Sequence, residues 1–365
     1  MNSHAIHIRC GDDILPILRE NSPGRAIRWA DPLSEGPPRA ARLPGNNDAR
    51  TATDLEARIE FLCADYGSAP DDARSYLLEQ DRNLLQLVAD SNDEGRITLW
   101  FEHDLFDHVI LLYLLNCLAE RGFAQNDRVE LIQIDRHASI QPPRIFHGLG
   151  QLSPADIVAL YSDPGPTVLN SEHWRSAHIA WQAWLHSTPE KIEAIAAGTE
   201  ATPGFPFLAA AFARHLREFP AQEHGLGETE VLILQALQDG DATSVAGLFR
   251  YYNARDALLG LGDLMFWPRI AGLAFVARPL IACSFQDGRS IPTRAQFLEG
   301  CQAGKLADLQ AILISLTDFG REVLAGRADH VAANGINCWR GGVRLKTPEN
   351  LWRWDAVSNR MRPGS

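Results

Sequence analysis

Four short apolar segments in the first 135 residues place the strongest constraint on the fold of this chain. They cover residues 6–10, 26–30, 97–101 and 129–134 and are rich in β-branched or aromatic residues, as strands are. Sequence with helical character, and no hairpin turn, joins each segment to the next. We therefore predict an α/β fold at the N-terminus, with one mainly parallel open sheet.

Acidic residues follow each of these predicted strands. In an open α/β sheet, ligands bind in the crevice outside the carboxyl ends of the strands. Carboxylates that gather in one crevice repel each other, so they need a cation, shared protons or a cationic ligand. The residues expected around this crevice are Asp12, Asp13, Asp31, Glu102, Asp104, Asp107 and Asp135.

The stretch from Glu102 to His108 holds five titratable residues in seven positions, directly after the third strand. A Glu-x-Asp pair at a strand end suits Mg²⁺ or Mn²⁺ opposite a substrate phosphate. We predict Glu102, Asp104 and Asp107 as metal ligands, and these three together with His108 as catalytic residues. One alternative is a charged helix start, in which Asp104 is the cap and Asp107 offsets the helix dipole. Ligand binding without a metal is another.

Two loops are expected beside the same crevice. Gly11 and Asp12 form a tight turn after the first strand, and Asp31 and Glu35 lie on a Pro- and Gly-rich loop that could close over the crevice. We predict these four as ligand-binding residues, the alternative being structural loops with capping carboxylates. The chain has no G-x-G-x-x-G motif and no P-loop lysine, which argues against dinucleotide and Walker-type nucleotide sites.

Three short helices followed by two strands are predicted from residue 225 onward, which is the outline of a winged helix. The helices are expected at 228–237, 242–252 and 256–271, and the strands at 273–276 and 280–283. The predicted units are an acidic α/β domain at 1–140, a helical connector at 141–224, a winged-helix-like α+β domain at 225–345 and a C-terminal tail at 346–365.

The charge is distributed unevenly between the two parts of the chain. Residues 1–244 carry 19 Lys and Arg against 36 Asp and Glu, while residues 245–365 carry 15 against 10, so a net charge of −17 faces one of +5. A basic surface with aromatics can contact a nucleic-acid backbone. We predict Arg250, Arg255 and Arg269 as nucleic-acid-binding residues, with docking onto protein as the alternative.

Several features indicate a cytoplasmic protein without a membrane segment. No apolar run reaches the ~18 residues of a membrane span, and the longest run, at 109–115, predicts a buried helix. No secretory signal is apparent at the N-terminus. The six cysteines show no C-x-x-C spacing, so we expect reduced thiols and no zinc knuckle.

Several segments resemble a bacterial family called domain of unknown function 1835. They are Gly11-Asp12, the loop from Trp29 to Pro37, and Leu99 to Asp107, with further likeness at 148–152, 207–220, 225–230, 316–320 and 334–342. The resemblance implies a bacterial origin and longer members with a winged-helix-like C-terminal region, but it implies no activity. Many members have Ser after the Gly-Asp pair, where this chain has Asp13, so no serine nucleophile is implied.

The function expected from these observations is binding or hydrolysis of a small molecule or phosphoester at the acidic crevice. A divalent cation, Mg²⁺ or Mn²⁺, is the candidate cofactor. The alternative is a ligand-responsive regulator or interaction protein, whose winged helix binds nucleic acid or protein.

Overall fold

The N-terminal sheet has the predicted parallel arrangement. The computed structural model describes residues 5–22, 24–41, 49–90, 95–291, 293–302 and 311–364. The strands stand in the order β2-β1-β3-β4-β5, and the first four are parallel, while β5 runs antiparallel to β4. Their bounds are β1 (Ile6–Arg9), β2 (Arg25–Arg28), β3 (Ile97–Glu102), β4 (Val129–Ile134) and β5 (Thr167–Val168).

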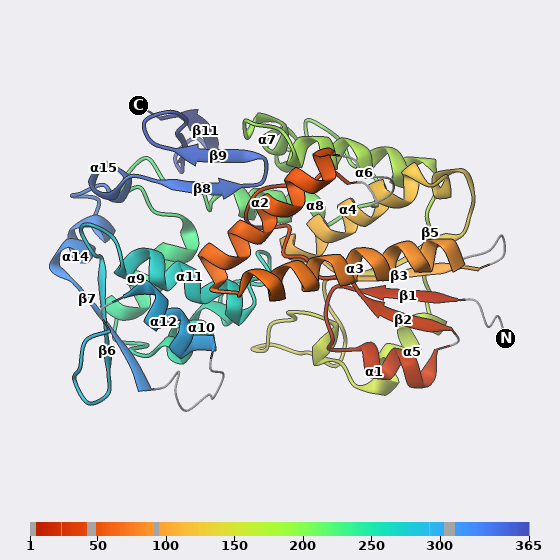
Figure 1. Cartoon of the computed structure of the whole chain (residues 1–365), viewed down its shortest axis with the longest axis horizontal. Coiled ribbons are helices and arrows are strands. Elements are labelled where there is room, and N and C mark those ends of the chain that lie inside the picture. Colours follow the sequence, from red (N-terminus) through yellow and green to blue (C-terminus); the bar gives the residue numbers. More distant parts are fainter. Residues whose placement is uncertain are drawn as a thin grey trace.

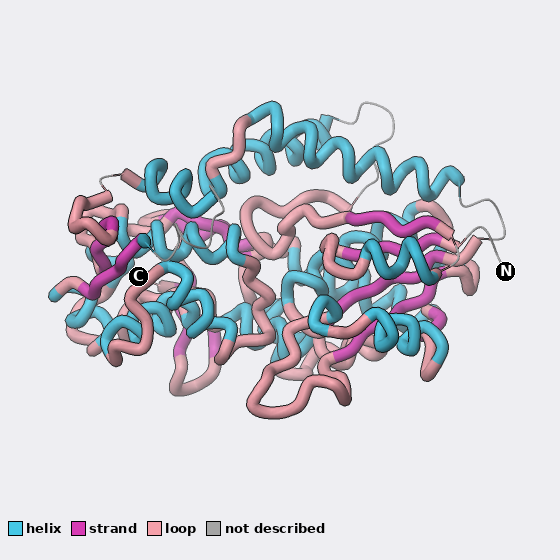
Figure 2. Tube along the Cα trace, turned by 90° about the horizontal axis from the view of Figure 1, so that it is seen from below, coloured by secondary structure: helices cyan, strands magenta, loops and turns pink. Residues whose placement is uncertain are grey.

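Helices cover both faces of this sheet (Figures 1 and 2). One face packs against α1 (Leu15–Asn21) and α5 (Pro154–Ser162) through a cluster that includes Trp100 and Ile132. The other face packs against α4 (Leu105–Glu120), because Leu99 and Phe101 point away from Trp100, as strand alternation requires. Two further helices, α6 (Ser171–Trp184) and α8 (Leu208–Leu216), lie against α4.

The helix α4 is buried around most of its circumference, as the apolar run at 109–115 predicts. The polar groups at its start are therefore also enclosed by protein. Between β2 and β3 the chain forms α2 (Ala49–Tyr66) and α3 (Pro70–Asp90), which pack against each other. The connector also contributes the short 3₁₀ turn η2 (Leu149–Gln151) and α7 (Glu190–Ala196). A second 3₁₀ turn, η1 (Phe123–Gln125), lies between α4 and β4.

The C-terminal region has the expected winged-helix-like outline, with differences in detail. Its helices are α9 (Glu228–Gln238), α10 (Val245–Asn253) and α11 (Asp263–Ala274). The third helix starts later than predicted because the Asp256 carboxylate accepts the amides of Leu258 and Leu259, which holds a turn there. Pro268 lies inside α11 without ending it.

The predicted hairpin of residues 273–276 and 280–283 is wrong. Leu273 and Ala274 end α11, and the strands that pair are β6 (Ile281–Phe285) and β7 (Ile312–Leu316), with α12 (Arg294–Gln302) between them in sequence. A short apolar run beside a helix does not by itself distinguish strand from helix. The chain continues with α14 (Asp318–Leu324), α15 (His330–Asn334), β8 (Asn337–Arg340), β9 (Val343–Lys346), β10 (Trp352–Asp355) and β11 (Arg360–Pro363).

One apolar cluster extends across the described chain from Ile6 to Met361. The connector supplies β5 to the sheet, and the predicted tail forms the β10–β11 hairpin, where the Met361 amide donates to Glu193 at 2.9 Å. The boundaries at residues 140, 224 and 345 stay predictions. Within the described ranges, no helix is long and apolar enough to cross a membrane.

Candidate functional site

A cavity of about 430 Å³ lies at the carboxyl ends of β1 and β3. The helices that follow these neighbouring strands, α1 and α4, pack on opposite faces of the sheet. The connections after β1 and β3 therefore leave the sheet toward opposite faces. Open α/β sheets form their ligand crevices at such points. On the sheet side the cavity is lined by Arg9 to Gly11, Asp13 and parts of 102–107, and on the other side by parts of 252–265.

Arg9, the last residue of β1, holds the carboxylates together. Its side chain is buried and donates to Asp13 at 2.9 and 3.1 Å, to Asp107 Oδ2 at 2.8 Å and to Glu102. It also contacts the Cys10 sulfur at 3.0 Å and the Trp100 carbonyl at 3.4 Å. All three guanidinium nitrogens of Arg9 thus donate to protein atoms.

Three buried carboxylates, one at the end of β3 and two at the start of α4, form the acidic part of the site. One oxygen from each of Glu102, Asp104 and Asp107 lies within 4.8 Å of the others. Asp104 caps α4 by accepting the Asp107 amide at 2.9 Å, and Asp107 accepts the Glu102 amide at 2.5 Å and the Cys10 thiol at 2.7 Å. Asp104 therefore acts as the helix cap, as the alternative interpretation predicts. The three carboxylates also converge closely enough to hold a cation.

Burial and repulsion between carboxylates favour the protonated forms of Glu102 and Asp104. Burial, followed by the charge of Asp107, raises the pKa of Glu102 to about 8 despite the nearby Arg9. Burial and the same neighbour raise the pKa of Asp104 well above its usual range. Burial also raises the pKa of the Cys10 thiol, which agrees with an inert cysteine.

Glycines bring the surrounding backbone close to the carboxylates. A Cβ on Gly148 would lie 2.3 Å from Cδ of Glu102, and one on Gly260 would lie 2.6 Å from Cγ of Asp104. The Leu149 amide donates to Glu102 at 2.6 Å. Backbone from two distant segments thus encloses the acidic groups.

Several predicted site residues lie elsewhere. Asp31 is buried and pairs with Arg58 and with Arg39 at 3.1 Å, and Glu35 accepts from Tyr66 and from Arg269, both at 2.6 Å. Their predicted position at the crevice is wrong, because the loop after β2 turns toward α2 and its arginine. Gly11 does line the cavity.

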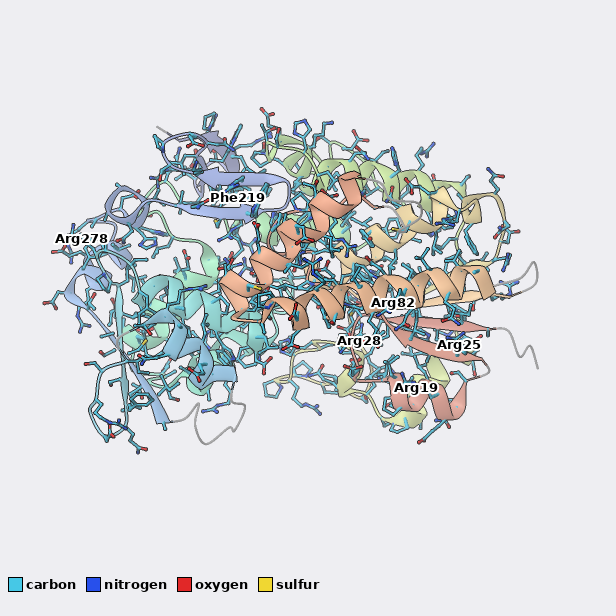
Figure 3. The ribbon with its side chains drawn as sticks, in the orientation of Figure 1. Arg19, Arg25, Arg28, Arg82, Phe219 and Arg278 are labelled. Atoms are coloured by element: carbon cyan, nitrogen blue, oxygen red, sulfur yellow. The ribbon has the colours of Figure 1, made fainter. Side chains whose placement is uncertain are left out.

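The two other expected carboxylates are surface groups. Asp12 pairs at 2.5 Å with Arg28, which lies at the end of β2 (Figure 3). Asp135 pairs at 3.0 Å with its neighbour Arg136. Neither lines the cavity, so the prediction that they join the crevice is wrong. Each carboxylate is instead held by an arginine outside the cavity.

His108 is fully buried below the site and does not line the cavity. Its Nδ1 lies 2.7 Å from the Asp104 carbonyl, and its Nε2 lies 3.2 Å from the Gln133 amide nitrogen. Burial lowers the pKa of His108 to about 4. It supports the α4 start and has no direct access to a ligand in the cavity.

The predicted nucleic-acid residues divide into two groups. Arg250 and Arg255 are exposed on and beside α10, with Arg255 3.4 Å above the Tyr251 ring. Arg269 instead lies inside the molecule, where it pairs with Glu35 at 2.6 Å and Glu218 at 3.6 Å. Its prediction as a surface phosphate contact is wrong, because α11 packs against α2.

Sequence reasoning missed part of the site. It placed Asp13 at the crevice without giving it a binding or catalytic role, and it named neither Arg9 nor Cys10 as a site residue. The 252–265 wall was assigned to another domain. The charged Arg9 at the end of an otherwise apolar strand was the available signal, because a buried arginine needs acidic partners.

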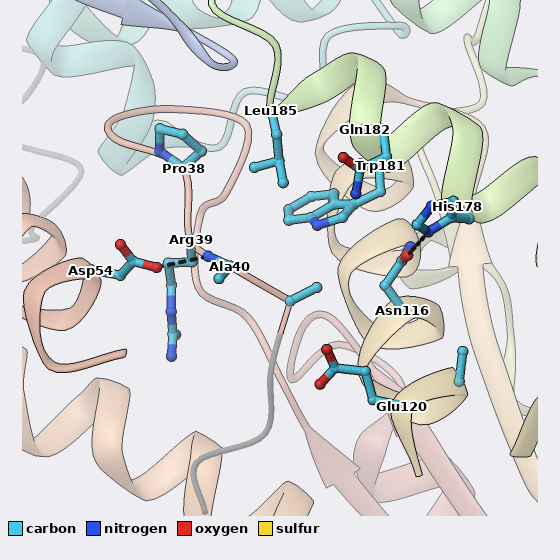
Figure 4. Close-up of a pocket in the computed structure, with 12 residues that line it drawn as sticks. Pro38, Arg39, Ala40, Asp54, Asn116, Glu120, His178, Trp181, Gln182 and Leu185 are labelled. Atoms are coloured by element: carbon cyan, nitrogen blue, oxygen red, sulfur yellow. Dashed lines mark hydrogen bonds between the residues drawn. The ribbon is translucent and has the colours of Figure 1, made fainter. Parts of the chain in front are cut away.

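Another cavity, of about 550 Å³, lies between the loop after β2, α4 and α6 (Figure 4). Its polar groups bond one another: Asn116 lies 3.2 Å from His178, and Asp54 accepts the Ala40 amide at 2.9 Å. Among the described residues, its titratable groups do not converge as those of the strand-end site do.

No family model matches the chain, and no curated protein matches it either. Membership of the family resembled by its sequence therefore stays a prediction, and the geometry of the site carries the functional argument.

Proposed function

We propose that the strand-end cavity binds a divalent cation, Mg²⁺ or Mn²⁺, together with a small molecule or phosphoester. Glu102, Asp104 and Asp107 would supply the oxygen ligands. The observation that carries this proposal is the convergence of three buried carboxylates on the wall of a cavity large enough for a small ligand.

The charge balance supports a cation. Four carboxylates, those of Asp13, Glu102, Asp104 and Asp107, surround one guanidinium. When all are ionised, three negative charges remain without a partner, so either protons or a cation must offset them. A cation fits a set of oxygen atoms within 4.8 Å of each other.

The cation would also make a phosphate ligand acceptable. Arg9 uses its nitrogens on protein acceptors, so it has no donor left for a phosphate oxygen. A phosphoester would meet carboxylates alone unless a metal stood between them. Hydrolysis would follow if the metal also bound and activated a water molecule.

Thermal unfolding with added metal tests the proposal. At a concentration 100 times Kd, a cation selective for the folded state stabilises it by about 2.7 kcal/mol. We expect MgCl₂ or MnCl₂ to raise Tm, and Asp104→Asn to remove most of that rise while keeping a cap acceptor. Asp12→Asn is the matched control, since Asp12 lies outside the cavity. An equal rise in Asp104→Asn, or none for either metal in the unmodified chain, contradicts the proposal.

A further inference from the structure

A larger cleft, of about 790 Å³, lies between α2, α11 and the β8–β9 hairpin (Figure 1). Three segments that the strand-end site does not use line it: Glu35 to Pro37, parts of 225–230, and 334–340. Phe61 and Phe275 provide apolar wall. Its size is that of a site for a small organic molecule.

Arg340 lines this cleft as a buried cation without an acidic partner. Its Nε donates to the Glu218 carbonyl at 2.9 Å and its Nη1 to the Trp339 carbonyl at 3.1 Å. Within the described chain its Nη2 makes no hydrogen bond, and no carboxylate lies within 4.0 Å of the guanidinium. The residue is 8 % exposed. Its hydrogen bonds go only to neutral carbonyls, and Glu218 offsets its charge only from beyond 4.0 Å. The guanidinium can therefore take an added anion.

The neighbouring arginines differ in this respect. Arg269 pairs with Glu35 and Glu218, and Arg294 pairs with Asp65 at 2.9 Å. Arg344, at the exposed edge, lies over the Trp339 ring and has no carboxylate partner among the described residues. Two guanidinium groups that line one cleft are thus available to an anion.

The positive charge of three arginines near Glu218, at the floor of the cleft, also favours an anion there. Burial alone would raise the pKa of Glu218, but Arg214, Arg269 and Arg340 hold it well below the usual range of a carboxyl. The field at this floor therefore favours negative charge.

We propose that this cleft binds a small organic anion, with carboxylate or phosphate oxygens against Arg340 and an apolar body against Phe61 and Phe275. Glu60 and Glu230 also line the cleft, so a ligand with one charged group fits better than a polyanion. This site is separate from the strand-end cavity and does not depend on a cation there.

Calorimetric titration at constant ionic strength tests the proposal with three probes. Benzoate and phenyl phosphate share an aromatic body and differ in the anion, and benzyl alcohol is the neutral control. We expect saturable binding of at least one anion and none of benzyl alcohol, and the tighter of the two identifies the preferred anionic group. Absence of saturable binding by both anions overturns the proposal.

Two variants locate the binding. Arg340→Gln removes the charge, and we expect at least a tenfold loss of affinity. Gly272→Leu fills the cleft from α11, where an added Cβ has nothing within 4 Å, and should block binding even if Arg340→Gln does not fold. Arg175→Gln, on the exposed face of α6, is the control. Affinity unchanged in Gly272→Leu overturns the proposal, while the metal response of this variant tests the strand-end site independently.

Discussion

Gly260 is one of the glycines whose side-chain size the acidic site limits. It has a φ of +69°, and a Cβ there would lie 2.6 Å from Cγ of Asp104. Gly122, after α4, has a φ of +84° with open space around it. Comparing alanine substitutions at Gly260 and Gly122 therefore distinguishes the cost of the left-handed backbone from the cost of the contact with Asp104.

We expect Gly122→Ala to lower the free energy of unfolding by roughly 1–2 kcal/mol, the cost of a left-handed conformation. Gly260→Ala should lose roughly 2–5 kcal/mol, because overpacking adds about 1–3 kcal/mol to that backbone cost. Urea denaturation measures both. Equal decreases in the free energy of unfolding for the two variants would mean that the Asp104 carboxylate does not restrict the side chain at position 260.

His215 makes stability sensitive to acid. It is buried against Trp184, and burial, followed by the charges of Arg340 and Arg269, lowers its pKa to about 3. The unfolded chain, with a histidine pKa near 6.5, then binds the proton more tightly. The contribution of His215 is present above pH 6.5 and is lost as the pH falls toward 3.

Between pH 7.5 and pH 5, this one group should lower the free energy of unfolding by about 2 kcal/mol. Denaturant titrations at the two pH values check the size of this change. His215→Phe should flatten the dependence, whereas His178→Gln, at an exposed position on α6, should leave it unchanged. The prediction fails if both variants keep the dependence of the unmodified chain.

At the scale of single elements, the packing of α11 decides what the winged-helix-like region can contact. In three-helix DNA-binding variants of the helix-turn-helix, the third helix lies in the major groove. Here α11 packs against α2, and Arg269 is held by Glu35 inside the molecule. The side of α11 that carries Arg269 is therefore covered.

We expect the full chain to show no salt-sensitive binding of duplex DNA, since Arg269 is held by Glu35 and residues 1–244 carry a net charge of −17. Fluorescence anisotropy with labelled DNA at low ionic strength measures this. Binding that weakens steeply with salt, and that Arg250→Ala reduces, would restore the nucleic-acid alternative.

Elements with a strong local pattern were predictable, and those defined by distant contacts were not. The four parallel strands end within two residues of the expected positions, because β-branched runs and acidic turns are local signals. The hairpin at 273–283 was wrong because Leu273 and Ala274 lie within α11, and β6 pairs with a strand some 30 residues away in sequence. Pairing over such a separation leaves no local trace.

For the whole molecule, the parallel sheet and the place of its crevice followed from sequence, but the membership of the site did not. Glu102, Asp104 and Asp107 converge as expected, since strand and helix geometry fix their spacing. Asp31 was misplaced because its partner Arg58 comes from another helix. The far wall, from Tyr252 to Met265, required knowledge of how the parts pack.

The two-sided cavity also has a consequence for the order in which the protein acquires its site. The acidic half, up to Asp107, leaves the ribosome long before the wall at 252–265 that closes it. At roughly 5–20 residues per second, the interval is on the order of 10 s. During that time the nascent chain exposes repelling carboxylates without their cover, so the binding site matures only after most of the polypeptide has been synthesised.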